Sequence, residues 1–377
     1  MTSKNDLQAL VGQLFVVGFE GLSVPSEFKE AVQDLNLGGT IYFKRNCESP
    51  AQLAELSNEL QFSVRSKNFY PLFIAIDHEG GIVNRLSKPF TKFPGNDALG
   101  ELGSPKVAFQ FGMYLAKELK AVGININFAP VVDVETNPNN PVMKKRMFSS
   151  DPEVVSKMGS AVCRGIQKMG VIAVAKHFPG HGDTTVDSHF ALPKVDKTFE
   201  QLDECELIPF KRLAKSRVEG IMTAHILNPN LDAEYPATLS IKTVEQILRK
   251  DLRFSKLIFS DDMEMKAIVD NYGAEEAAVL AVNAGCDVLI YRGDNGLPHK
   301  NIEAIIKAVE SNRIPKAKIE AAVQRIHAAK KSYCAVTHPI EVTEVTKFVG
   351  LADHLHLADC IQRGELPKNL ADAGDHE

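Results

Sequence analysis

Titratable side chains are concentrated in one short stretch, residues 171–193 (VIAVAKHFPGHGDTTVDSHFALP). It opens with an apolar run from Val171 to Ala175, long enough for one buried strand. The next fourteen residues contain three histidines, two aspartates and a lysine, namely Lys176, His177, His181, Asp183, Asp187 and His189. A strand that leads directly into such a loop, which is also rich in Gly and Pro, is typical of a functional site displayed by a scaffold and less typical of a polar surface loop.

Two parts of the sequence could supply acid–base and nucleophilic chemistry. Asp187 and His189 stand two residues apart, so in an extended loop the carboxylate could orient the imidazole and raise its pKa, as a general acid and base requires; a simple loop salt bridge is the alternative. Asp261 ends the apolar run KLIFSDD, where it could attack an anomeric carbon or stabilise an oxocarbenium ion. The same aspartate could instead cap a following helix.

Other charged residues have the chemistry to hold a hydroxyl-rich ligand. They are Asp77, Arg85, Arg146, Lys176 and His177. For Arg85 and Arg146 taken alone, an ion pair is the stronger expectation. A metal site built from His177, His181, Asp183 and His189 is a further alternative, but Pro179 and Gly180 prevent the helical spacing of a zinc-binding HExxH pair. The glycines and Pro179 also predict an irregular, mobile loop over residues 178–188.

The elements that position these residues alternate between two types. Eight short apolar runs predict strands, at residues 14–18, 40–43, 72–76, 125–129, 172–175, 220–223, 257–259 and 288–291. Helical periodicity marks residues 50–66, 105–122, 152–169, 199–216, 243–252, 274–284, 300–311 and 318–332. Eight such units favour a single TIM-like (β/α)8 barrel over a doubly wound open sheet. The polar residues follow the strands, so a barrel would gather them on its C-terminal rim.

Composition narrows the class of protein further. The 377 residues carry a net charge of −5, which does not favour nucleic acid or an anionic membrane as a partner. The sequence contains neither an apolar run of membrane-spanning length nor a signal-peptide pattern, so we expect a cytoplasmic protein whose six separated cysteines are reduced. The barrel is predicted over residues 1–335, followed by an extension, 336–377, with one helix at 351–363 and a polar tail from 364.

The stretch KHFPGHGDTTVDSH, residues 176–189, resembles the signature of the glycoside hydrolase family 3 β-N-acetylglucosaminidases, and especially of bacterial enzymes that recycle cell-wall fragments. Four further stretches agree: IDHEGGIVNRL, NINFAPVVDVETNPNNPV, residues 146–148, and LIFSDDMEM. The resemblance extends from about residue 8 to 335.

The resemblance implies a TIM-like barrel that hydrolyses β-linked N-acetylglucosamine with retention. It assigns Asp261 as the nucleophile, His189 as the acid/base and Asp187 as its partner. It makes Asp77, Arg85, Arg146, Lys176 and His177 sugar-binding residues. It implies no cofactor and no metal. The expected substrate is N-acetylglucosaminyl-1,6-anhydromuramic acid, with or without its peptide, and we expect a monomer.

Some residues depart from the family pattern, in which Gln usually stands at the position of His78 and Arg at that of Ile82. The stretch MKKRMFSS also differs from the usual form at Lys144, Lys145 and Met147. These changes affect the expected substrate preference more than the reaction type. A phosphorylase, a β-glucosidase of the same family and a non-catalytic sugar-binding barrel remain alternatives, although a pure binder needs no trio of Asp187, His189 and Asp261.

Overall fold

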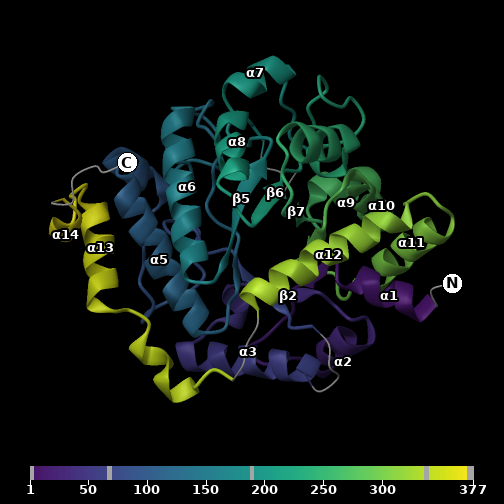
Figure 1. Cartoon of the computed structure of the whole chain (residues 1–377), viewed down its shortest axis with the longest axis horizontal. Helices are drawn as coiled ribbons and strands as arrows, with labels where there is room; N and C mark the ends of the chain where they lie inside the picture. The colour runs from purple at the N-terminus through teal and green to yellow at the C-terminus, as the bar shows by residue number, and fades with distance from the viewer. Residues whose placement is uncertain (1–3, 66–69, 187–190, 335–338, 372–377) are drawn as a thin grey trace.

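The fold is a closed barrel of parallel strands surrounded by helices (Figure 1). The structure is a computed structural model that describes residues 4–65, 70–186, 191–334 and 339–371. The strands pair in chain order, and β1 closes on β8. Their bounds are β1 Phe15–Val17, β2 Gly39–Tyr42, β3 Phe73–Ile76, β4 Ile126–Asn127, β5 Ile172–Phe178, β6 Gly220–Thr223, β7 Leu257–Asp262 and β8 Val288–Tyr291. The prediction of a (β/α)8 barrel is therefore confirmed.

The strands are short apolar runs because both of their faces are covered. Every residue of β1, β2 and β8 is buried, as expected for parallel strands with side chains inside the barrel and helices outside. Aromatic rings help to fill the interior, where Phe128 and Phe259 meet edge to face at 5.6 Å between centroids. This double burial explains why the runs read as continuous and not as alternating patterns.

The helices form the outer layer (Figure 1). Their bounds are α1 Lys4–Gly12, α2 Ser26–Asp34, α3 Pro50–Arg65, α4 Asn96–Leu102, α5 Pro105–Ala121, α6 Pro152–Lys168, α7 Phe199–Glu204, α8 Leu207–Lys215, the π-helix η3 Lys242–Asp251, α9 Lys266–Tyr272, α10 Ala274–Ala284, α11 His299–Glu310 and α12 Lys316–Tyr333. The starts of α5 and α6 agree with the prediction, because Ser104 and Asp151 cap them ahead of a first-turn proline.

One predicted helix is in fact two. Residues 199–216 read as continuous, but α7 ends at Glu204 and α8 begins at Leu207. Pro209 provides the reason, because its ring would clash with the carbonyl of Cys205 four residues earlier in an unbroken helix. Cys205 accordingly leaves helical geometry, with φ −137° and ψ −80°.

Two strands run further than the sequence predicts. β5 continues through Lys176 and His177 to Phe178, and β7 continues through Asp261 to Asp262. Each strand therefore carries its polar residues into the rim as part of the barrel wall.

The C-terminal part packs on the outside. The 3-10 helix η4 Val342–Lys347 lies against α3, and α13 Ala352–Gln362 lies against α4 and α5, with α14 Lys368–Ala371 beyond it (Figure 1). Glu118 of α5 anchors this part, accepting from His354 Nδ1 at 2.7 Å and from the Gly350 N–H at 3.0 Å. The region predicted as irregular, 335–350, thus contains η4, whereas the helix predicted at 351–363 is confirmed.

None of the helices in the described part of the chain is long and apolar enough to cross a membrane. All six cysteines are free thiols, as predicted, and four of them are buried.

Lys330 of α12 offers a test of the packing. The side chain is fully buried beneath the barrel, with Nζ 2.8 Å from Gln13 Oε1 and 5.0 Å from the centre of the Phe73 ring. Burial lowers the pKa of Lys330 from 10.5 to about 7. Between these values the unfolded chain binds the proton that the folded chain has lost, so this residue makes stability rise with pH.

We therefore expect Lys330→Met to gain stability relative to the native chain as pH falls from 10 to 7, in urea unfolding followed by circular dichroism. Below pH 7 the difference should level off, because the amine is then protonated in both states. A difference that stays constant with pH would contradict this assignment.

Candidate active site

A cavity of about 460 Å³ opens at the C-terminal rim of the barrel. Asp77 and Arg85 from the segment after β3 line it, together with Asp261 and Asp262 of β7. Apolar side chains from inside the barrel, including Phe128 and Met222, form part of its wall. Its position is the one at which TIM barrels carry their active sites, and the volume suits a sugar-sized ligand.

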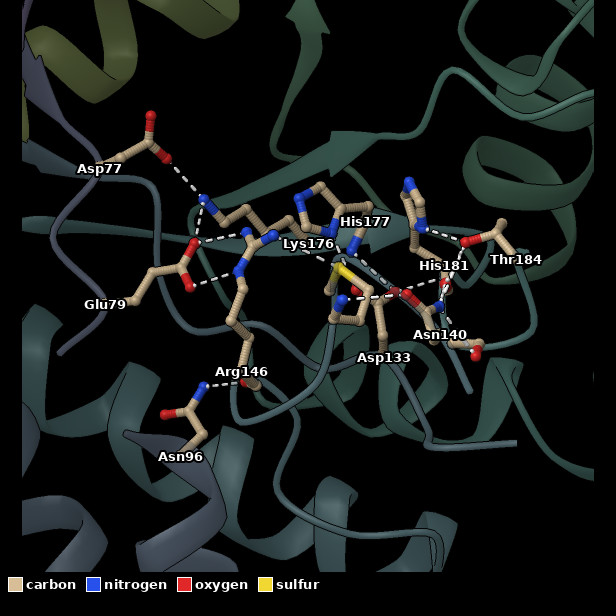
Figure 2. Close-up of polar contacts among 12 residues, drawn as sticks. Asp77, Glu79, Asn96, Asp133, Asn140, Arg146, Lys176, His177, His181 and Thr184 are labelled. Carbon is tan, nitrogen blue, oxygen red and sulfur yellow. Dashed lines mark hydrogen bonds and ion pairs between the residues drawn. The ribbon is translucent and has the colours of Figure 1, made fainter. Parts of the chain in front are cut away.

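A buried ion-pair network forms one side of the site (Figure 2). Lys176 Nζ lies 2.5 Å from Asp77 Oδ1 and 2.8 Å from Glu79 Oε1. Arg146 makes two parallel contacts with Glu79, at 2.9 and 2.8 Å. Burial opposes the charge on Glu79, but the two cations outweigh it and hold the pKa of this carboxyl well below its usual range. Glu79 is thus the shared counter-ion of Arg146 and Lys176, while Asp77 reaches the cavity.

A second network supports the end of β5 (Figure 2). Asp133, fully buried after β4, accepts hydrogen bonds from His177 Nδ1 at 2.8 Å and from the His181 N–H at 2.7 Å. Although burial would raise its pKa, these contacts with His177 and His181 lower the pKa of Asp133. Because Asp133 is an ionised acceptor, Nδ1 of His177 carries a proton, and the ring orientation is fixed.

The segment after β5 is packed against the protein as far as Thr184. Asn140 Nδ2 donates to the carbonyls of His181 and Gly182 at 2.9 and 3.1 Å, and Thr184 Oγ1 lies 2.8 Å from His181 Nδ1. Burial lowers the pKa of His181 to about 4, so this imidazole is neutral. The described part of the predicted irregular loop, residues 179–186, contains neither helix nor strand, and these contacts hold it as far as Thr184. The rest of that prediction, from residue 187 onward, lies outside the described residues.

The two aspartates that end β7 have different surroundings. Asp261 is half-buried in the cavity wall, and its Oδ1 accepts from the Asp262 N–H at 2.8 Å. Burial would raise its pKa, but His225, His177, that N–H and Lys176 together hold the pKa of Asp261 at about 2. Burial raises the pKa of Asp262 to about 8, because its contacts with backbone N–H groups and Arg292 compensate only in part.

The helix-cap alternative for Asp261 is wrong. The helix α9 begins only at Lys266, with Met265 at the cap position. Asp262 Oδ1 instead accepts from the Glu264 N–H, within the turn that follows the strand.

The structure brings together most of the residues predicted for the site. Asp77, Arg85 and Asp261 line the cavity, Lys176 contacts Asp77, and His177 stands beside Lys176 on β5. Arg146 lies behind them in its ion pair with Glu79, as the alternative for this residue expected. Asp187 and His189, the predicted acid/base pair, lie outside the described residues.

Five further residues hold the groups described above, namely Glu79, Asp133, Asn140, His225 and Asp262. All except Asn140 follow or end strands of the predicted barrel, so the sequence places them on the rim, although it assigns them no role. Asn140 carries no local pattern that separates it from an ordinary loop residue.

The metal-site alternative finds no support among the described residues, where no group of three or more His, Cys, Asp or Glu side chains is arranged to hold an ion. His177 and His181 instead face one another edge to face, with ring centroids 5.5 Å apart.

The departures from the family pattern lie at different depths. His78 is buried and accepts from the Arg85 N–H through Nδ1 at 3.3 Å, so it supports the backbone of a cavity residue. Met147 is also buried, in a small cluster with Val131 and Met143. Ile82, by contrast, is 64% exposed, so a substrate could meet it only at the surface.

A (β/α)8 barrel with a carboxylate held ionised in a rim cavity, beside ion-paired groups suited to hydroxyls, has the features that a glycoside hydrolase requires. The model of the glycosyl hydrolase family 3 N-terminal domain matches residues 6–329. The chain belongs to this family, which confirms both the resemblance and the prediction of a glycoside hydrolase.

Relatives agree with this assignment. Beta-hexosaminidase A of Pseudoalteromonas piscicida is 37% identical over 82% of this chain, although the chain spans only 55% of that protein's length. Beta-hexosaminidase of Neisseria meningitidis serogroup C is 36% identical over 74% of this chain and 77% of its own length. Among solved structures, a family 3 beta-N-acetylglucosaminidase from Paenibacillus sp. str. FPU-7 gives a TM-score of 0.89 at 39% identity, covering 95% of this chain and 68% of that one.

The ion-pair network predicts a large effect for Glu79→Gln. Removing the shared charge leaves Arg146 and Lys176 buried with only part of their compensation, so we expect a loss of about 3–5 kcal/mol in the free energy of unfolding. Urea unfolding measures it. The matched control is Glu59→Gln, which removes the exposed pair with Lys29 and should cost less than about 1 kcal/mol. Equal effects at both positions would contradict the role assigned to Glu79.

Proposed function

We propose that the protein is a retaining exo-β-N-acetylglucosaminidase, which removes N-acetylglucosamine from the non-reducing end of a β-linked substrate. The observation that carries the proposal is Asp261, half-buried at the cavity wall and kept ionised by its neighbours. An ionised carboxylate in the wall of a sugar-sized cavity is the group that a retaining mechanism needs as nucleophile. The names of the relatives supply the expected sugar.

The proposed reaction has two steps. In the first, an Asp261 oxygen attacks the anomeric carbon, the bond to the leaving oxygen breaks, and His189 gives that oxygen a proton. In the second, water attacks the anomeric carbon, His189 takes the proton of the water, and the Asp261 carboxylate is released. Asp187 orients and charges His189. This scheme needs no cofactor.

In this proposal the sugar binds at the side of the cavity that carries the ion pairs. Asp77, held by Lys176, presents carboxylate oxygens that can accept from two hydroxyls, Arg85 can donate to sugar oxygens, and Nε2 of His177 can accept from a hydroxyl. Arg146 fixes Glu79 and, through it, Lys176. Arg146 thus shapes this side from behind.

The substrate we propose is a cell-wall fragment in which anhydromuramic acid is the leaving group. Lys44, Arg45 and Arg292 line the cavity on the side of β2 and β8, and such cations suit a leaving group that carries a carboxylate. The same cations would also suit inorganic phosphate, which keeps a phosphorylase as the second candidate. A cytoplasmic, monomeric enzyme remains part of the proposal, and the free thiols are consistent with that compartment.

The proposal is tested with aryl β-N-acetylglucosaminide against aryl β-glucoside. We expect release of aryl alcohol from the first substrate and little from the second. Added phosphate should leave the rate unchanged and yield free N-acetylglucosamine. Formation of a sugar 1-phosphate would establish the phosphorylase instead, and a preference for the glucoside would make the enzyme a β-glucosidase.

Asp261→Ala should lose at least ~10³-fold in turnover while still folding, because an essential nucleophile is deleted. Steady-state rates measure the loss, and circular dichroism checks the fold. Asp270→Ala, an exposed position on α9, is the matched control and should behave as the native chain. Near-native turnover in Asp261→Ala would move the nucleophile elsewhere, with Asp262 the first suspect.

His189→Ala should slow glycosides with poor leaving groups far more than activated aryl glycosides, because a good leaving group needs little proton donation. Asp187→Ala should show a milder form of the same pattern. Rates across an aryl series of rising leaving-group pKa measure the effect, with the exposed His299→Ala as control. If His189→Ala slows every member of the series equally, and added azide rescues none, His189 is not the acid/base.

A further inference from the structure

His225 is a buried histidine for which the proposed mechanism has no role. It follows β6, is fully buried, and is held on both sides of its ring. Nδ1 lies 2.9 Å from Thr238 Oγ1, and Nε2 lies 2.9 Å from the carbonyl oxygen of Asp262. A ring fixed at both nitrogens by buried partners has one orientation, so it can hold whatever it contacts in place.

The direction of one of these hydrogen bonds follows from chemistry alone. A carbonyl oxygen only accepts, so Nε2 of His225 carries the hydrogen that it shares with Asp262. On the other side, Thr238 Oγ1 lies 2.9 Å from Thr223 Oγ1 of β6 and 3.0 Å from the Ala224 carbonyl. These contacts hold the ring against the end of its own strand, β6, so the contact with the Asp262 carbonyl links β6 to the end of β7.

Asp262 connects His225 to the proposed nucleophile, Asp261. The Asp262 carbonyl accepts from His225 and also from the Met265 N–H at 3.1 Å. The N–H of the same residue donates to Asp261 Oδ1 at 2.8 Å. Any change that lets the Asp262 backbone rotate would therefore move the donor that orients the Asp261 carboxylate.

We propose that His225 is a positioning residue for the nucleophile: by binding the Asp262 carbonyl it restrains the backbone of the residue whose N–H orients the carboxylate of Asp261. The proposal rests on the proposed role of Asp261. His225 is not among the residues that line the cavity. It also stands near enough to Asp261 to favour the charged carboxylate, which is the state that attacks.

Two substitutions separate positioning from simple packing. In His225→Gln the side-chain amide can place a donor where Nε2 stood, and so keep the contact with Asp262. In His225→Asn the shorter amide can keep a contact with Thr238 but does not reach the Asp262 carbonyl. The matched controls are His354→Gln and His354→Asn, at another buried histidine that binds Glu118 in the C-terminal part.

The experiment measures kcat and KM with an activated aryl β-N-acetylglucosaminide and the rate of covalent trapping by a 5-fluoro N-acetylglucosaminyl fluoride. Intact mass follows the trapping rate, and peptide mapping identifies the residue that carries the adduct. His225→Asn should lose ~10²-fold in kcat and in trapping rate with KM unchanged, because a misdirected nucleophile slows the attack and not the binding. His225→Gln should recover most of that loss. Both His354 variants should lose stability while keeping native rates per folded molecule.

The outcomes distinguish this inference from the proposed function. Trapping of the native enzyme at a residue other than Asp261, or no adduct at all, would overturn the proposed function. Trapping at Asp261 with equal losses in His225→Asn and His225→Gln would overturn the positioning role alone. Native kcat in His225→Asn would overturn it as well, as would a rise in KM with kcat unchanged.

Discussion

The site depends on how the barrel accommodates a buried lysine. Lys176 sits on β5, inside the wall of the barrel, with its side chain only 3% exposed. A lysine in that position is stable only if carboxylates meet it, and Asp77 and Glu79 from the end of β3 do so. Two carboxylates around one ammonium leave a surplus of negative charge, which Arg146 neutralises from behind. Each of these four charged groups is therefore stable in the interior only because the others compensate its charge.

That requirement explains why the segments of the rim are so firmly held. The turn after β3 carries both Asp77 and Glu79, so fixing these two carboxylates also fixes the turn that leads to Arg85. The loop after β4 is held twice, once by Arg146 through Glu79 and once by Asp133 through His177. Charge compensation between neighbouring strand ends therefore builds a rigid wall on which a sugar can be bound.

On the β7 side of the cavity, two adjacent carboxyl groups differ in pKa because their surroundings differ. Asp261 and Asp262 are adjacent on β7, yet the pKa of one is about 2 and that of the other is about 8. The cations and imidazoles of β5 and β6 favour charge on Asp261, whereas burial disfavours it on Asp262. One residue can then act as an ionised nucleophile while its neighbour adds little negative charge beside it. Two chemically identical side chains therefore have different pKa values because the strands around them differ.

The sequence by itself determined the barrel and much of its rim. Apolar runs of strand length fixed the existence of all eight strands, and their order along the chain placed Asp77, Lys176, His177 and Asp261 at one end. It also carried the motif that identifies the family. These features are local, because a strand or a motif is written in consecutive residues.

Only the tertiary structure decided which charges meet. Periodicity ends β5 at Ala175, since the next residues are polar, but the strand continues because Asp77, Glu79 and Asp133 satisfy Lys176 and His177 from other strands. Likewise, Asp261 could have capped a helix, and Arg146 could have faced a ligand. Nothing local distinguishes these outcomes, because a buried charge takes its role from partners tens of residues away, and those partners are placed only when the barrel closes.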